Sequence, residues 1–213
     1  MLVVRGGVLI SLEGVEGSGK TTQLSLLAQE LTRRGMEVLT TREPGGTALG
    51  EAIRGLLLNP AHAPTPWTEL FLLEAARAQL VTTVIRPALE RGTWVLVDRF
   101  TDSSLAYQAA GRGLAWRTVR ALNALATGGL SPHRTLVLQL PLGRALARAR
   151  QRLSTGPENR RFEDESEAFH RRVAKAYARI ATREPHRVRL VNGEGTPRQV
   201  HARVLEALED LLP

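Results

Sequence analysis

The amino-acid sequence predicts an α/β fold, a three-layer sandwich in which a mainly parallel central sheet is covered by helices on both faces. Short apolar runs with the composition of buried strands alternate with longer segments of helical periodicity along the chain. The first apolar run leads through a glycine-rich loop into a helical segment. The length of 213 residues fits one domain, and neither a fixed-period repeat nor a linker divides it. We therefore expect residues 1–213 to form a single domain.

The first half of the chain is expected to contain three strands. The apolar run 7–12 is rich in β-branched residues, and the runs 37–41 and 93–97 also have the character of strands. Apolar residues at helical spacing predict helices between and after these strands, at 24–34, 48–58, 67–91, 102–110 and 115–126. Pro87 is expected to kink the end of the longest helix, because proline has no N–H group to donate.

The second half repeats this alternation. The expected strands lie at 134–140 and 188–191, and the expected helices at 142–152, 163–183 and 197–212. A polar break that contains glycine and proline separates two of these helices at 154–161. We expect this break to be a mobile surface loop and not a domain boundary. Strands that alternate with helices in this way are typical of a parallel sheet with both faces covered.

The composition excludes several classes of protein. Apolar residues make up 43% and charged residues 23%, as in ordinary globular domains, so a disordered or collagen-like chain is excluded. No apolar run approaches the ~18–20 residues that span a bilayer, and the first residues lack the pattern of a signal peptide. With 0 cysteines there is neither a disulfide nor a thiolate ligand. We therefore expect a cytoplasmic protein with no membrane partner.

Residues 14–21 read GVEGSGKT and match the phosphate-binding pattern G-x-x-x-x-G-K-[ST] in full. A strand precedes this loop and a helix follows it, so backbone N–H groups at the helix N-terminus can surround the phosphates of a nucleotide. Lys20 would reach the β- and γ-phosphates, and the hydroxyl of Thr21 would bind Mg²⁺. The motif predicts a P-loop NTPase type of fold and a donor-binding site that comprises Gly14, Val15, Glu16, Gly17, Ser18, Gly19, Lys20, Thr21 and Thr22.

A P-loop is shared by ATPases, GTPases and kinases, and further observations favour a kinase. The chain has no N-K-x-D sequence of the kind that reads guanine. The strand at 93–97 is followed by Asp98 and Arg99, and not by the glutamate that commonly orients water in an ATPase. A phosphate acceptor, with a second pKa of ~6, needs no strong base in order to attack. It needs cations to hold it next to a second anion, and arginine suits this task because its planar fork matches phosphate oxygens.

Five segments carry a resemblance to a known family: GVEGSGKTTQ, REPGGT, AARAQL, VDRFTDSSLAYQAAGRG and RRFEDESEAFHRRVAKAY. In this order, over residues 8–180, they resemble bacterial thymidylate kinase, a P-loop nucleoside monophosphate kinase. The resemblance implies direct in-line transfer of a phosphoryl group from ATP to thymidine 5′-monophosphate (dTMP), with Mg²⁺, in the synthesis of dTTP. It also implies a homodimer, to which the apolar region 67–73 could contribute.

The resemblance implies roles for the residues that match its motifs. Arg42 resembles the arginine that grips the 5′-phosphate of the acceptor, and Arg99 resembles the one that contacts this phosphate near the transferring group. Asp98 resembles the acid at a strand end that lies near Mg²⁺. Glu16 resembles the acidic residue that faces the 3′-hydroxyl of the acceptor sugar.

The base pocket is expected to be lined by hydroxyl and amide groups, which select a base by directional hydrogen bonds, namely Ser103, Ser104 and Gln108. Arg77 resembles the arginine that reads the pyrimidine edge, although a mid-helix arginine is ordinarily ion-paired or exposed. Tyr107 resembles the ring that crowds the 2′ position and favours deoxyribose, and it could also belong to the core. Leu73 stands where the family usually has an aromatic residue that stacks on thymine. Phe71 is displaced by two residues, about 200° on a helix, so selectivity for thymine over uracil is left open.

A lid is expected at about 148–162, where arginines bracket the polar break. The P-loop carries Glu-Gly where some relatives place a basic residue, so a further cation for the transferred phosphoryl group would have to come from elsewhere. We expect Arg152 or Arg161 to close over the γ-phosphate, and Arg148 to pack on the adenine of the donor. A solvated basic helix face is the alternative interpretation of these arginines.

Two other functions stay open at this point. One is a P-loop kinase for another nucleoside monophosphate. The other is a nucleic-acid-binding module, suggested by a formal charge of +8 from 29 basic and 21 acidic residues. Aromatic residues make up only 4% and are not interleaved with basic ones as in RNA-binding surfaces. Small-molecule nucleotides, and not nucleic acids, are therefore the expected partners.

Overall fold

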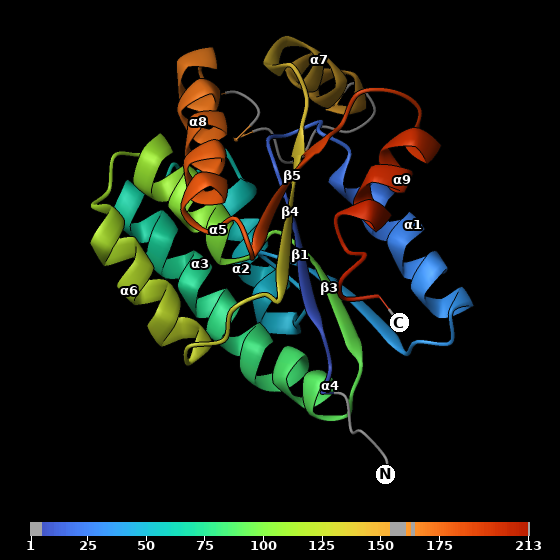
Figure 1. Cartoon of the computed structure of the whole chain (residues 1–213). Coiled ribbons are helices and arrows are strands. Elements are labelled where there is room, and N and C mark those ends of the chain that lie inside the picture. The colour runs from blue at the N-terminus through green and yellow to red at the C-terminus, as the bar shows by residue number, and fades with distance from the viewer. Residues whose placement is uncertain (1–5, 154–160, 163–164, 213) are drawn as a thin grey trace.

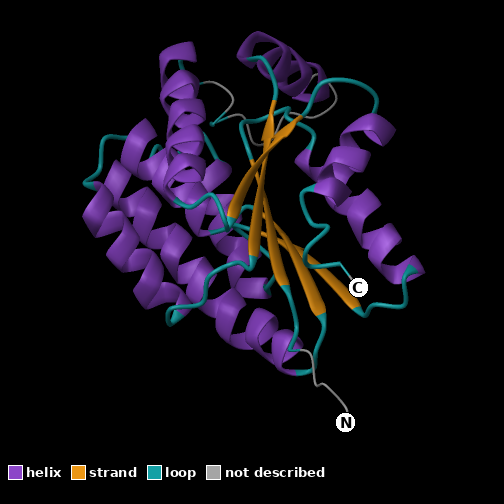
Figure 2. Ribbon diagram, viewed as in Figure 1, coloured by secondary structure: helices purple, strands orange, loops and turns teal. Residues whose placement is uncertain are grey.

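The computed structural model of the chain describes residues 6–153, 161–162 and 165–212. Its centre is a sheet of five strands in the order β2-β3-β1-β4-β5, with every pair of neighbours parallel (Figures 1 and 2). The strands are β1 Leu9–Glu13, β2 Val38–Arg42, β3 Trp94–Asp98, β4 Arg134–Gln139 and β5 Val188–Asn192. The expected fold class is confirmed, and the described sheet is wholly parallel.

The two faces of the sheet are covered by different helices. Alternate residues of a strand point to opposite faces. On one face, Ile10 and Leu12 of β1 belong to an apolar cluster with α1 (Lys20–Arg33) and α9 (Pro197–Glu206). On the other face, Leu9 of β1 belongs to a cluster with the helices that connect β2 to β3. The chain therefore forms helix, sheet and helix layers, which are visible in Figure 2.

The remaining helices lie between successive strands. Between β2 and β3 come α2 Ala48–Leu58, α3 Pro66–Leu80, the π-helical segment η1 Val81–Ile85 and α4 Arg86–Glu90. Between β3 and β4 come α5 Thr101–Ser104, the π-helical segment η2 Leu105–Gly111 and α6 Trp116–Thr127. Between β4 and β5 come α7 Leu142–Leu153 and α8 Glu167–Arg183. None of the described helices has both the length and the apolar character needed to cross a membrane.

Two of the expected helices contain π-helical turns. The chain does not form one α-helix over 67–91 but continues from α3 through η1 into α4. Pro87 is the second residue of α4, and in a regular α-helix its ring would collide with the carbonyl four residues earlier. The wider turn of η1 lies directly before this point, so the irregularity expected at Pro87 extends upstream of it. The helix expected at 102–110 is likewise divided into α5 and η2.

Two helix ends differ from the expectation. The helix α8 begins at Glu167 and not at residue 163, because the hydroxyl of Ser166 caps it by accepting from the N–H of Phe169 at 3.2 Å. The helix α9 ends at Glu206 and not at residue 212, and tighter turns follow it, with the N–H of Leu208 donating to the carbonyl of Leu205 at 3.1 Å. Of the break expected at 154–161, Arg161 alone lies within the described residues.

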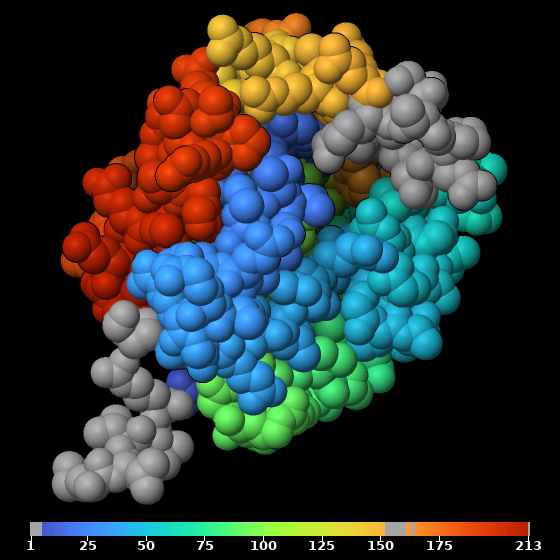
Figure 3. Space-filling model, turned by 90° about the vertical axis from the view of Figure 1, so that its right-hand side faces the viewer, coloured from blue at the N-terminus to red at the C-terminus, as the bar shows by residue number. Residues whose placement is uncertain are grey.

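The carboxyl ends of three strands bring polar residues to one edge of the sheet. β1 ends at Glu13, directly before the P-loop, while β2 ends at Arg42 and β3 at Asp98. In the sheet register Arg42 lies opposite Asp98, and Asp98 lies opposite Leu12. Ligands of open α/β sheets bind beyond this edge. The surface is hollowed there, between the segments coloured blue for α1, light blue for β2–α2 and yellow for α7 in Figure 3.

Candidate active site

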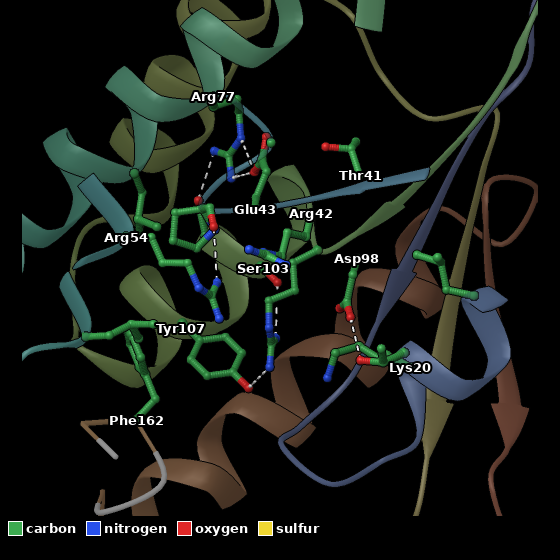
Figure 4. A pocket seen from close by; sticks show the side chains of 18 of the residues that line it. Lys20, Thr41, Arg42, Glu43, Arg54, Arg77, Asp98, Ser103, Tyr107 and Phe162 are labelled. Atoms are coloured by element: carbon green, nitrogen blue, oxygen red, sulfur yellow. Dashed lines mark hydrogen bonds and ion pairs between the residues drawn. The ribbon is translucent and has the colours of Figure 1, made fainter. Parts of the chain in front are cut away.

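A cavity of about 840 Å³ opens at the carboxyl edge of the sheet (Figure 4). Its wall is formed by the P-loop, the ends of β2 and β3, the helices α2 and α3, the segment η2, and Phe162. Many of the residues expected to form the site line this one cavity, namely Glu16, Gly17, Lys20, Thr21, Arg42, Leu73, Arg77, Asp98, Arg99, Ser103, Ser104, Tyr107 and Gln108. The structure therefore brings the expected donor and acceptor residues together.

The P-loop needs glycine at two positions in particular. Gly19 has a φ of 98°, in the left-handed region, directly before the free N–H groups of α1. Gly17 has a φ of 75°, and a Cβ atom built there would lie 2.0 Å from the carbonyl oxygen of Ala145 in α7. The helix α7 therefore rests directly on the P-loop, and its backbone leaves no room for a side chain at position 17.

Lys20, at the start of α1, reaches back over the P-loop. Its ammonium donates to the carbonyl oxygens of Gly14 at 3.0 Å and Val15 at 3.1 Å. Burial, followed by the charge of Arg99, lowers the pKa of Lys20 to about 8, although nearby carboxylates act in the opposite direction. A buried ammonium that neutral carbonyls hold is well suited to bind an anion.

Thr21 and Asp98 place two oxygen atoms side by side in the cavity. The hydroxyl of Thr21 donates to Oδ2 of Asp98 at 3.0 Å, at a solvent-accessible position. A hydroxyl and a carboxylate are hard oxygen ligands of the kind that Mg²⁺ takes, usually together with water and substrate phosphates. These two residues therefore fit Mg²⁺ next to phosphates held by the P-loop.

Arg99 has a left-handed backbone that is uncommon for an arginine, with a φ of 70°. Its N–H donates to the carbonyl of Leu12 at 3.0 Å. The following N–H, of Phe100, donates to the carboxyl group of Glu13 at 2.7 Å. Glu13 is fully buried, and this burial raises its pKa to about 7. The two hydrogen bonds fix the turn after β3 and so determine where the guanidinium of Arg99 lies.

That guanidinium is bound to a carboxylate of the P-loop. Nη2 of Arg99 lies 2.7 Å from Oε1 of Glu16 and donates to the hydroxyl of Tyr107 at 3.1 Å. The same hydroxyl lies 2.8 Å from each carboxylate oxygen of Glu16, to which it donates. Burial alone would raise the pKa of Glu16, but Arg99 and Lys20 lower it, so Glu16 is charged. Glu16 and Arg99 thus neutralise each other in a partly buried cluster.

Two further arginines approach the same part of the cavity (Figure 4). Arg42, at the end of β2, donates from Nη2 to both carboxylate oxygens of Glu51 at 3.0 Å, and this pair is open to solvent. Arg54, from α2, donates to the carbonyl of Pro44 at 3.1 Å. Burial and the neighbouring charge of Arg42 lower the pKa of Arg54. Arg54 is not among the residues predicted from the sequence, although its spacing of one helical turn from Glu51, after the REPGGT turn, is a usable signal.

Arg77 of α3 lies on the cavity wall as the centre of a buried network. Nε and Nη2 donate to Glu43 at 2.8 and 2.6 Å, and Nη1 donates to Glu74 at 2.7 Å. Its other acceptors come from neighbouring elements and are Ser104, Asn123 and the carbonyl of Phe100. The side chain of Arg77 is 2% exposed, and each of its guanidinium nitrogens donates a hydrogen bond. The ion-paired arginine that the sequence allowed is what the structure contains, and a role for Arg77 in reading a base stays a prediction.

Ser103 and Gln108 line the cavity with their donor groups already engaged. The hydroxyl of Ser103 donates to Glu13 at 2.6 Å, and the amide of Gln108 donates to Glu69 at 2.7 Å. The π-helical segment η2 presents both Tyr107 and Gln108 to the cavity. Such segments are frequent at functional sites because they change which side chains face one direction.

Leu73 contributes an apolar side chain to the cavity wall at the position where the family usually has an aromatic ring. Phe71 does not replace that ring: its side chain is 55% exposed and stacks on Trp67, with ring centres 5.9 Å apart. The displacement of Phe71 around the helix is therefore as expected from its spacing. Any stacking on a base would have to come from another residue.

The structure does not bring Arg161 to the P-loop. Its Nε donates to the carbonyl of Leu57 at 2.7 Å, and it forms an ion pair with Glu69 of α3. Glu69 is fully buried, so a nearby guanidinium that neutralises it is strongly favoured. Arg148 is exposed on α7. The side chain of Arg152, at the end of α7, lies outside the described residues, so its expected role stays a prediction.

Phe162 also lines the cavity, and the sequence analysis did not single it out. Its ring lies edge-on to Tyr107 with centres 5.9 Å apart, and the guanidinium of Arg161 lies 4.7 Å from its centre. The remaining expected P-loop residues do not line the cavity but shape the loop around Lys20, and they are Gly14, Val15, Ser18, Gly19 and Thr22.

A P-loop that faces a cluster of arginines across one cavity, on a parallel five-stranded sheet, defines a P-loop kinase for a small phosphorylated acceptor. A sequence model described as thymidylate kinase matches residues 12–204. The chain belongs to the thymidylate kinase family, which confirms the resemblance seen in its motifs.

Similar proteins cover nearly the whole chain. A thymidylate kinase of Syntrophotalea carbinolica is 50% identical over 198 residues, which are 92% of each chain. One of Rhizorhabdus wittichii is 48% identical over 210 residues, covering 97% of this chain and 99% of the relative. The crystal structure of thymidylate kinase from Ehrlichia chaffeensis superposes with a TM-score of 0.78 at 30% identity, over 95% of this chain and 99% of that chain.

Proposed function

We propose that this protein transfers the γ-phosphoryl group of ATP to dTMP in the synthesis of dTTP, releasing ADP and thymidine 5′-diphosphate, with Mg²⁺ and without a covalent intermediate. One observation carries the proposal: the P-loop with Lys20 and the arginines Arg42 and Arg99 line the same cavity. Two anions repel each other, and cations on both sides of one cavity can hold them in line for transfer.

On the donor side, the backbone N–H groups at the start of α1 bind the β- and γ-phosphates. The ammonium of Lys20 exchanges the carbonyls of Gly14 and Val15 for phosphate oxygens and stabilises the charge on the transferred group. Thr21 and Asp98 would hold Mg²⁺, which would supply further neutralisation of the phosphates.

On the acceptor side, the 5′-phosphate of dTMP supplies the attacking oxygen. With a second pKa of ~6 it is largely a dianion at neutral pH, so no side chain has to remove a proton. Arg42 and Arg99 bind this dianion, and Arg54 adds a third guanidinium to the same wall. Because a guanidinium is planar and donates two parallel hydrogen bonds, it orients the attacking oxygen as well as neutralising it.

The nucleoside of dTMP would occupy the part of the cavity that η2 and α3 line. Glu16 and Tyr107 face the sugar in this arrangement, and Tyr107 disfavours a 2′-hydroxyl. Leu73 gives the base an apolar wall, while Gln108 supplies a polar edge. Polar groups that a substrate must satisfy discriminate more strongly than an apolar wall does.

A coupled assay of ADP release, with ATP and Mg²⁺ and with dTMP, dUMP, UMP or CMP as acceptor, tests the proposal. We expect dTMP to have the highest kcat/KM, and UMP and CMP to be slower by about 10²-fold or more. The proposal would be contradicted if adding dTMP did not raise the rate of ADP release above the rate measured without an acceptor. Equal rates with UMP or CMP would favour the alternative, a P-loop kinase for another nucleoside monophosphate.

We also propose that the protein is a homodimer. Trp67 and Phe71 on α3 support this, because they are 41% and 55% exposed and form a stacked apolar pair on the surface. Sedimentation of the wild type against a variant with both rings changed to glutamate measures the effect, and a monomeric wild type would contradict the proposal. The cytoplasmic location and the absence of a nucleic-acid partner stay predictions.

A further inference from the structure

His170 on α8 is a buried polar side chain that the proposed reaction does not use. It is 0% exposed, and neither ring nitrogen has a hydrogen-bond partner among the described residues. Buried polar groups are almost always hydrogen-bonded, and leaving one without a partner is destabilising. The imidazole therefore has a nitrogen available for a polar group that comes within hydrogen-bond distance.

The polar group next to His170 is the carboxylate of the P-loop. Nδ1 of His170 lies 3.5 Å from Oε2 of Glu16. The imidazole is fixed in place by packing, because the ring of Phe169 lies edge-on to it with centres 5.5 Å apart. A shift of a few tenths of an ångström by the carboxylate would make a hydrogen bond of ordinary length.

Glu16 has a reason to shift during the reaction. Its main partner is Nη2 of Arg99, at 2.7 Å. In the proposed reaction, the 5′-phosphate of the acceptor competes with Glu16 for this same guanidinium. Glu16 is 8% exposed, so water cannot readily replace the arginine. The hydroxyl of Tyr107 has one hydrogen to donate, which the two oxygens of Glu16 already share.

We propose that His170 is a positioning residue that receives Glu16 when the acceptor phosphate takes Arg99. Nδ1–H of His170 then donates to Oε2 of Glu16, so that the carboxylate remains charged and directed toward the acceptor sugar. The neutral imidazole suffices, since one ring nitrogen carries a hydrogen without any change of charge. The inference rests on the proposed function, because it needs a phosphorylated acceptor at Arg99.

Two substitutions separate this role from packing. His170→Phe keeps a planar ring but removes both nitrogens, whereas His170→Asn loses volume but keeps an amide donor near the position of Nδ1. We expect His170→Phe to raise the KM for dTMP about tenfold while the KM for ATP changes little. His170→Asn should retain a KM for dTMP within about threefold of the wild type. If His170 only filled space, the smaller Asn would be the more damaging replacement.

Thermal unfolding gives a second readout. In the nucleotide-free protein, His170→Phe removes a buried group without a partner, so Tm should stay the same or rise. The increase in Tm that dTMP produces should become smaller in this variant, while the increase produced by ATP should not. Val173→Ala, at another buried position of α8, is the matched control: it should lower Tm and leave the ratio of the two KM values unchanged.

The decisive combination places His170→Phe in a Glu16→Gln background. The tenfold effect on the KM for dTMP should largely disappear there, because the carboxylate it depends on is gone. Three results would overturn the inference: an unchanged KM for dTMP in His170→Phe, an equal rise in His170→Asn, or an undiminished effect in the Glu16→Gln background. Failure of the proposed function is recognised separately, since the wild type itself would then not phosphorylate dTMP, and the inference would fall with it.

Discussion

The donor and acceptor halves of the cavity are built differently. Apart from Asp98, the donor half comes from one contiguous segment, and Lys20 contacts the neutral carbonyls of Gly14 and Val15. The acceptor half is assembled from separate elements, and three of its arginines hold carboxylates: Arg42 with Glu51, Arg77 with Glu43 and Glu74, and Arg99 with Glu16. ATP therefore has to displace only dipoles from Lys20, whereas an acceptor phosphate has to compete with carboxylates for its arginines.

The three arginines that hold carboxylates also differ in burial. The side chain of Arg42 is 55% exposed, that of Arg99 is 19% exposed and that of Arg77 is 2% exposed. An exposed ion pair contributes little and exchanges partners easily, while a buried pair is strongly destabilising to break. This difference in burial separates two kinds of arginine. Arg42 and Arg99 can exchange a carboxylate partner for a substrate phosphate, whereas Arg77 stabilises the fold.

The largest effect is expected at the donor half. Lys20→Met removes the ammonium that neutralises the transferred phosphoryl group, so kcat should fall by about 10³-fold. The binding of dTMP, measured by calorimetry, should remain within a few-fold of the wild type, because Lys20 contacts the P-loop and not the acceptor arginines. If dTMP binding fell as steeply as kcat, the two halves would not be separate.

Arg77 should affect stability more than chemistry. Arg77→Met leaves Glu43 and Glu74 buried without their cation, and we expect the free energy of unfolding in urea to fall by about 3–5 kcal/mol. The matched control is Arg42→Met, which breaks an exposed pair and should change the free energy of unfolding by less than about 1 kcal/mol. Equal losses in the two variants would remove the distinction between the arginines.

Arg42 should affect acceptor binding more than stability. Arg42→Met removes a charge-assisted hydrogen bond to the acceptor phosphate, so the KM for dTMP should rise on the order of thirtyfold. The KM for ATP should change little. Steady-state kinetics with each substrate varied in turn measures both constants. A rise confined to the KM for ATP would show that Arg42 binds the donor and not the acceptor.

The smallest expected effect is a pH dependence confined to the donor half. Burial lowers the pKa of Lys20 to about 8, so its ammonium is lost from the free enzyme as the pH rises through this value. Because kcat/KM reports groups of the free enzyme, kcat/KM for ATP should fall about tenfold between pH 7 and pH 9. A Lys20→Arg variant should lose this dependence even if it is slow. A pH profile identical in Lys20→Arg would show that another group is responsible.

The same difference between the halves explains what the sequence could predict. The P-loop is contiguous, so its strand, glycines and helix can be recognised together. Asp98 can be placed next to Thr21 because the carboxyl ends of parallel strands meet at one edge of the sheet. The acceptor half depends on which elements become neighbours in the fold. Glu43 contributes to it through its contact with Arg77, 34 residues away in the sequence, which no local spacing specifies.

The arginines around the polar break show that charge alone does not predict which partner a side chain will have. The sequence contains arginines around a polar break, and this pattern predicts that one of them reaches the donor phosphates. It does not reveal that Glu69, in the first turn of α3, is fully buried and binds Arg161. The expected start of α8, at residue 163, is also wrong. The helical pattern of the sequence begins before Ser166, but the cap at Ser166 decides where the helix begins.

The most direct test of the central claim is a crystal structure of the protein with dTMP and a non-hydrolysable ATP analogue. We expect Arg42 and Arg99 both to contact the 5′-phosphate of dTMP, and Arg99 to have released Glu16. A bound dTMP whose phosphate lies elsewhere, with the Arg42–Glu51 and Arg99–Glu16 pairs still intact, would contradict it.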